Sequence, residues 1–130
     1  MKRKSINPWS WSTALGFDQG QLIEQPQHLL ICSGQDAVNS NGDPQYPDDM
    51  MAQLKLALDN VEAILADVEM TFANIVRITV YTTDVDEFFK HWESLTSRFG
   101  ASSRFTTSIV GVTRLAAPNL KVLLEVTAID

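Results

Sequence analysis

Apolar residues recur at steps of three and four between positions 51 and 68, which is the spacing of one face of an α-helix. They are Met51, Leu54, Leu58, Val61, Leu65 and Val68. Asp48 precedes this pattern, and an aspartate side chain can accept hydrogen bonds from the free amides of a first helical turn. The pattern therefore predicts a helix that is capped by Asp48 and begins at Asp49 and Met50.

A second helical stripe follows Asp84, which has Glu87 three residues later, the spacing of a capping box. The stripe consists of Val85, Phe88, Trp92, Leu95 and Phe99. Gly100 supplies a natural end, because glycine readily adopts the left-handed conformation that closes helices. A second helix is predicted over positions 84–99.

The β-branched residues and the alternating segments predict strands. The clearest is 75–82, with Val76, Ile78 and Val80 on one face and Ile75, Arg77, Thr79 and Tyr81 on the other. Two strands are predicted near the C-terminus, at 105–112 and 121–129. Two shorter ones are predicted at 17–25 and 28–33, with the segment up to Trp11 irregular and 34–47 a loop rich in Asn, Gly, Asp and Pro.

The predicted order is β-β-β-α-β-α-β-β in one domain over residues 1–130, an α+β fold of two layers. A helix that joins two strands favours a parallel crossover. With the helices on one face of the sheet, the other face needs a cover. Because that face mixes Arg77, Thr79 and Glu125 with apolar residues, we expect other copies of the chain to cover it in a closed cyclic assembly.

Composition narrows the function classes. A formal net charge of −6 disfavours nucleic acid and anionic membranes, since phosphate contacts rely on Lys and Arg. The basic run Lys2, Arg3 and Lys4 is interpreted as solvated. Cys32, the one cysteine, is interpreted as a buried core residue. With no apolar run of membrane length, no signal core and no disulfide, we expect a cytoplasmic protein without membrane contact.

Several segments, in this order, resemble the RidA/YjgF family, also known as L-PSP endoribonucleases or enamine/imine deaminases. The main ones are 16–20 (GFDQG), 32–35 (CSGQ), 41–44 (NGDP), 60–65 (NVEAIL), 75–84 (IVRITVYTTD), 110–115 (VGVTRL) and 124–128 (LEVTA). The resemblance implies a chorismate-mutase-like (RidA) fold, a homotrimer with a central β-barrel, and ligand clefts between subunits. No metal-ligand spacing or phosphate-binding glycine loop is present, so no metal or other cofactor is expected.

The resemblance also implies where a ligand would bind. Alignment on 110–115 places Thr107 where deaminases of the family hold the substrate carboxylate with arginine, and Leu123 where they carry a glutamate that helps to activate water. The other positions implied to line the cleft are Phe17, Ser33, Gly34, Trp92 and Ile109. Arg104 and Glu125 are candidates for the missing roles. Arg104 could bind an anion or be a solvated residue, and Glu125 could be a base or a structural partner of Arg77 or Lys121.

Three hypotheses follow. The chain binds a small organic-acid-type metabolite at the inter-subunit clefts with the usual deaminase residues replaced, and whether it is an enzyme stays open. Alternatively, it is an enamine/imine deaminase, a hydrolase, that uses Arg104 to hold the substrate carboxylate. A third possibility is a non-catalytic regulator or chaperone-like interaction protein.

Overall fold

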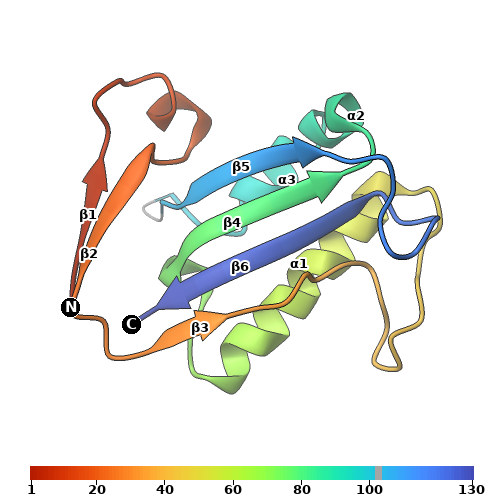
Figure 1. Cartoon of the computed structure of the whole chain (residues 1–130), viewed down its shortest axis with the longest axis horizontal. Coiled ribbons are helices and arrows are strands. Elements are labelled where there is room, and N and C mark those ends of the chain that lie inside the picture. The colour runs from red at the N-terminus through yellow and green to blue at the C-terminus, as the bar shows by residue number, and fades with distance from the viewer. Residues whose placement is uncertain (102–103) are drawn as a thin grey trace.

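The computed structural model describes residues 1–101 and 104–130 and confirms the predicted two-layer α+β order. A four-stranded sheet has the order β3-β6-β4-β5, formed by β3 (Leu29–Ile31), β6 (Val122–Ile129), β4 (Ile75–Thr82) and β5 (Thr106–Gly111). The helices α1 (Met50–Asp67), α2 (Val85–Phe89) and α3 (Trp92–Thr96) lie on one side of it, behind the sheet in Figure 1. β4 and β5 pair in parallel, as a helical crossover requires.

A separate two-stranded sheet stands beside one end of the larger one (Figure 1). It pairs β1 (Lys2–Ile6) with β2 (Gly20–Glu24) in antiparallel fashion. The expectation of an irregular N-terminal segment was therefore wrong. β1 has little apolar patterning because four of its five residues are exposed, so neither of its faces gives a core signal.

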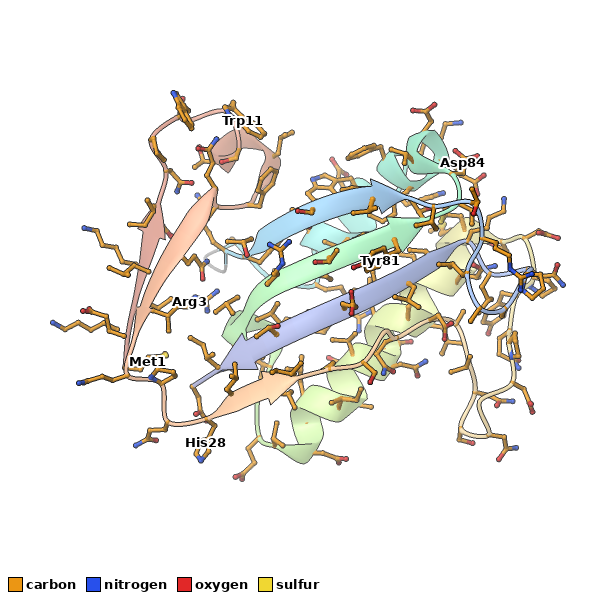
Figure 2. The ribbon with its side chains drawn as sticks, in the orientation of Figure 1. Met1, Arg3, Trp11, His28, Tyr81 and Asp84 are labelled. Carbon is orange, nitrogen blue, oxygen red and sulfur yellow. The ribbon has the colours of Figure 1, made fainter. Side chains whose placement is uncertain are left out.

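Arg3 corrects the interpretation of the basic run as solvated. Its guanidinium donates hydrogen bonds to the carbonyl oxygens of Ala73 (2.6 Å), Ile75 (2.7 Å) and Arg104. It also donates to Gln21 Oε1 at 2.9 Å. In Figure 2 Arg3 points from the two-stranded sheet toward the end of the larger one. Arg3 thus links the two sheets, whereas Lys2 and Lys4 are exposed as expected.

α1 begins one residue later than predicted, because Asp49 rather than Asp48 is the N-cap and accepts a hydrogen bond from the Ala52 amide. Most of the predicted stripe is buried, but Met51 and Val68 are 59% and 45% exposed. Gln53 takes a core position instead. It donates to the Tyr46 and Asn119 carbonyls and accepts from the Lys121 amide, so its burial leaves no amide atom unpaired.

The second predicted helix is split into α2 and α3. Asp84 caps α2 by accepting from the Glu87 amide, but the Glu87 side chain contacts Lys121 Nζ at 3.3 Å rather than closing a capping box. The break falls at Lys90 and His91, whose amides bond carbonyls only three residues back. These tighter turns end α2 without changing the apolar stripe, which stays buried at Phe88, Leu95 and Phe99.

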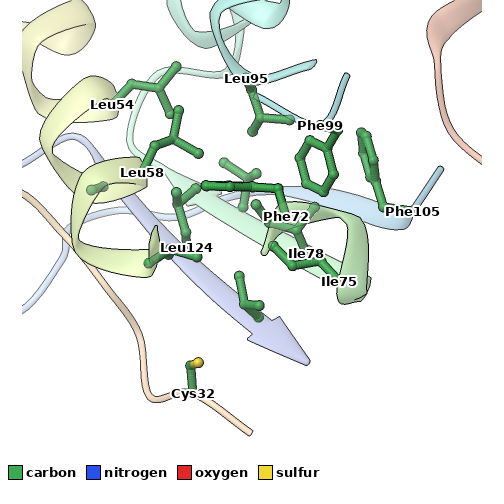
Figure 3. Close-up of a cluster of buried hydrophobic side chains, with 14 of the residues drawn as sticks. Cys32, Leu54, Leu58, Phe72, Ile75, Ile78, Leu95, Phe99, Phe105 and Leu124 are labelled. Carbon is green, nitrogen blue, oxygen red and sulfur yellow. The ribbon is translucent and has the colours of Figure 1, made fainter. Parts of the chain in front are cut away.

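The core lies between the helices and the four-stranded sheet, as Figure 3 shows for Leu58, Phe72, Ile78 and Leu124. Cys32 belongs to it, as predicted, and burial raises the pKa of its thiol. Ile75 was expected on the opposite face, with Arg77. A register irregularity between β4 and β6 at Ile75 and Arg77 turns Ile75 into the core instead.

Candidate functional site

A cavity of about 420 Å³ lies at the β5 edge of the sheet, on the helix side. β5 supplies Thr107 and Ile109, which pair with the core residues Ile78 and Val80 of β4 and therefore face the helices. The segment before β2 and the helices α2 and α3 supply the rest of the wall. The remaining lining residues are Trp11, Leu15, Phe17, Phe89 and Trp92.

Aromatic contacts hold this wall together. Phe17 lies edge-to-face between Trp11 and Trp92, with ring centroids 5.7 and 6.3 Å away and interplanar angles of 80° and 82°. This is a preferred arrangement for aromatic pairs. Trp92 Nε1 also donates to the Leu15 carbonyl at 3.0 Å. The N-terminal segment is thereby fixed to α3 across the cavity.

Asp18, which follows Phe17 in the chain, anchors the segment before β2. Its side chain is fully buried and accepts hydrogen bonds from Ser5 Oγ (2.6 Å), Asn7 Nδ2 (2.8 Å) and Gln21 Nε2 (2.9 Å). Burial alone would raise the pKa of Asp18, but these bonds and the nearby Arg104 charge outweigh burial and hold the pKa below its ordinary value. Asp18 is therefore a buried carboxylate that fixes the start of β2.

Thr107 contributes a hydroxyl group to this largely apolar wall. Its Oγ1 is buried and has no hydrogen-bond partner among the described residues. None of the described residues that line the cavity is charged. Thr107 is the position that the resemblance aligned with a substrate-holding arginine. The wall there is therefore neutral and carries one unpaired hydroxyl.

Arg104 is not part of this wall. It lines a neighbouring cavity of about 530 Å³ together with Thr13, Gly16 and Phe105. Its Nε lies 3.9 Å from Asp18 Oδ1, which partly offsets its charge. Within one chain the structure does not bring Arg104 together with Thr107.

Three other predicted site residues lie away from the cavity. Leu123 is on the open face of the sheet, and Gly34 packs against it so closely that a Cβ on Gly34 would be 2.6 Å from Leu123 Cδ2. Ser33, next to Gly34, is exposed. The predicted set is therefore divided. Phe17, Trp92, Thr107 and Ile109 lie around this cavity, Arg104 lines the neighbouring one, and Ser33, Gly34 and Leu123 lie elsewhere.

Glu125 is exposed on the same open face. It does not pair with Arg77 or Lys121 as one interpretation expected: Arg77 Nη2 donates to Ser108 Oγ, and Lys121 pairs with Glu87. Its neighbour is Tyr81, visible on the sheet in Figure 2. Hydrogen bonding to the Glu125 carboxylate raises the pKa of Tyr81.

Metal and membrane sites give no further candidates in residues 1–101 and 104–130. No group of three His, Cys, Asp or Glu side chains that could bind a metal ion occurs there. No helix in the same ranges has the length and apolar character to cross a bilayer.

The family model described as "Endoribonuclease L-PSP" matches residues 16–130. The chain belongs to the RidA/YjgF family. A RutC family protein of Pyrococcus abyssi is 30% identical over 129 residues, which span 97% of this chain and 87% of that protein. A crystal structure of a Rid family protein of unknown function, YyfB from Yersinia pestis, has a TM-score of 0.89, with 27% identity and full coverage of both chains.

The 2-iminobutanoate/2-iminopropanoate deaminase of Escherichia coli is 36% identical to this RidA/YjgF chain over 61 residues, which span 47% of each protein. The chain spans about half the length of the first curated relatives it matches, since the matched segment covers 46% of each of two RutC family proteins from Pasteurella multocida and Haemophilus influenzae.

Sequence reasoning missed three cavity residues of this RidA/YjgF chain. Trp11 and Leu15 lie in a stretch without strand or long-helix periodicity, and Phe89 lies outside the apolar stripe of its helix. All three are large apolar side chains that stay exposed. The available signal was that Trp11 and Leu15 lie close to Phe17 in the sequence and Phe89 lies close to Trp92. Only the fold brings all of them to one cavity.

Proposed function

We propose that this RidA/YjgF chain forms a homotrimer and binds a small organic-acid-type metabolite in clefts between its copies. The division of the predicted site residues supports the proposal most directly. Thr107 and Ile109 face the helix side of the sheet, while Leu123 faces the open side. Because one chain keeps these groups apart, a cleft that contains both needs a second copy.

The open face of the sheet supports the assembly. Leu29 and Ile31 of β3 are 60% and 72% exposed, and Val110 of β5 is also exposed. Apolar side chains gathered on one face are typical of protein–protein interfaces. Figure 1 shows that none of the helices in the described part of the chain covers this side.

Sedimentation analysis of the wild type and of Ile31→Asp tests the proposal, combined with calorimetric titration of pyruvate as a small organic-acid probe. We expect three copies for the wild type, with pyruvate binding. Ile31→Asp places a charge on the open face, so we expect a folded monomer that no longer binds pyruvate.

Met51→Asp is the matched control, because Met51 is similarly exposed but lies on α1, in the helical layer. This variant should keep both assembly and binding. A monomeric wild type, or a monomeric variant with undiminished pyruvate affinity, would contradict the proposal.

Deaminase activity is a second candidate, favoured by the similarity to the Escherichia coli deaminase. Arg104 would then hold the substrate carboxylate in its own cavity rather than beside Thr107. An assay with a 2-aminoacrylate intermediate tests this. Wild-type acceleration that Arg104→Ala abolishes would support it, and equal, uncatalysed rates for both proteins would exclude it.

A further inference from the structure

We infer that the part of the ligand that enters the Thr107 cavity is an uncharged aromatic ring carrying one hydrogen-bonding group. This inference rests on the proposed metabolite binding and specifies what the cavity selects. Any acid group of the ligand would then lie outside the aromatic wall, toward the cleft mouth.

The charge of the wall is the first argument. The residues around the 420 Å³ cavity are apolar, aromatic or, at Thr107, neutral. A carboxylate in such a wall would lose its hydration without gaining a cation or a set of donors, which is strongly unfavourable. Arg104, the cation that the sequence offers for this role, lines a different cavity and lies beside Asp18.

The shape of the wall is the second argument. Phe17 already forms edge-to-face contacts with Trp11 and with Trp92, and the ring centroids of Phe89 and Trp92 are 6.2 Å apart. A ring placed among them can continue the same edge-to-face pattern, which adds to the free energy of area burial. The volume lies within the usual range for small-molecule sites, about 300–1,000 Å³.

Thr107 is the third argument. Its hydroxyl is unpaired and buried, a state that carries a free-energy penalty. Thr107 lines the cavity, so a change of its χ1 rotamer that exposes Oγ1 would present the hydroxyl to a ligand. A ligand that offers a donor or acceptor there would relieve the penalty, whereas a purely hydrocarbon ligand would not.

Calorimetric titration of the assembled protein with two matched ligand pairs tests the inference. Phenylpyruvate and pyruvate share the acid and differ by the ring, and benzamide and acetamide share the amide and differ by the ring. We expect the ring-bearing member of each pair to bind at least about tenfold more tightly. Equal affinities within the pairs, or no binding of either ring compound, would overturn the inference. The latter would follow if a side chain of a neighbouring copy filled the cavity.

Two variants localise the binding. Thr107→Val should weaken benzamide about fivefold through loss of the hydrogen bond, while Thr113→Val, the same change at an exposed site, should have no effect. Phe89→Ala removes an exposed rim side chain and should also weaken benzamide without impairing folding. Unchanged benzamide affinity in both cavity variants would place the ring elsewhere and refute the assignment.

The two proposals fail separately. If benzamide binds and neither acid does, the organic-acid part of the proposed function is wrong and the ring preference stands. If pyruvate and phenylpyruvate bind equally, metabolite binding stands and the ring preference is wrong.

Discussion

At the residue scale, the unpaired hydroxyl of Thr107 lowers the stability of the ligand-free protein and is available to hydrogen-bond a ligand. Its unpaired, buried Oγ1 contributes nothing to the ligand-free protein and keeps the desolvation cost of a hydroxyl, about 1–3 kcal/mol. Thr107→Val retains a β-branched strand residue of similar shape. We expect its free energy of unfolding to rise by about 1 kcal/mol in urea denaturation of the ligand-free protein.

The control for this effect is Thr106→Val, on the neighbouring position of β5. The Thr106 hydroxyl donates to the Val76 carbonyl at 2.7 Å, so the same change there should destabilise the protein. A loss of stability in Thr107→Val would mean that Oγ1 is satisfied in solution, and the reason for a ligand hydrogen bond at Thr107 would disappear.

Asp18 gives a prediction of pH dependence. Its pKa is lowered in the folded chain from an ordinary value of 3.8, so the folded state binds this proton less readily than the unfolded state. The stabilisation is then present above pH 3.8 and is lost as the pH falls below that value through the folded pKa. We expect the free energy of unfolding to decrease over this acidic range.

Asp18→Asn should be less stable than the wild type at neutral pH and should lose part of this acid dependence, as measured by urea denaturation at a series of pH values. Asp86→Asn, at an exposed aspartate on α2, is the comparison. If Asp18→Asn and the wild type showed parallel pH curves, other groups would control the acid transition.

At the element scale, the hydrogen bonds of Arg3 attach the β1–β2 pair to the larger sheet, and substituting Arg3 tests this attachment. Its bonds to the Ala73, Ile75 and Arg104 carbonyls join this pair to the end of the larger sheet. Hydrogen bonds from a charged donor contribute about 1.5–3 kcal/mol. Arg3→Met should therefore reduce the amide-exchange protection of β1 and β2 at least about tenfold and leave β4 and β6 nearly unchanged.

Lys4→Met is the matched control, since Lys4 is on the same strand and exposed. It should leave the exchange pattern unchanged. Equal loss of protection in all strands of Arg3→Met would instead indicate that the two sheets unfold as one unit.

Strands β4 and β1 show where prediction from the sequence succeeds and where it fails. The β4 bounds of 75–82 were predicted correctly because a run of β-branched residues alternates with polar ones. β1 was missed because its role depends on one long side chain reaching carbonyls 70 and 72 positions away. A periodicity argument detects core faces, and β1 has none.

The candidate site, like the fold, could be predicted only in part. Alignment by resemblance selected Phe17, Trp92, Thr107 and Ile109, and the fold brings these four to one cavity. Arg104 lies three residues before Thr107 in the sequence, but the fold places it beside Asp18 and in a neighbouring cavity. No linear spacing contains that information.

At the scale of the whole molecule, Glu125 tests whether a negative charge on the open sheet face weakens the proposed assembly. It lies exposed on the open sheet face beside Tyr81, without an ion-pair partner among the described residues. If copies of the chain pack on this face, three equivalent carboxylates lose hydration together, and burying an unpaired charge is costly. Glu125→Gln keeps the shape and removes the charge.

We therefore expect Glu125→Gln to dissociate at lower protein concentrations than the wild type, with a shift of about tenfold or more in sedimentation at a series of dilutions. Glu93→Gln, at an exposed position of α3 in the helical layer, should behave as the wild type. Weaker assembly of Glu125→Gln would instead indicate that a partner group pairs with this carboxylate across the interface, which would favour a structural role over that of a catalytic base.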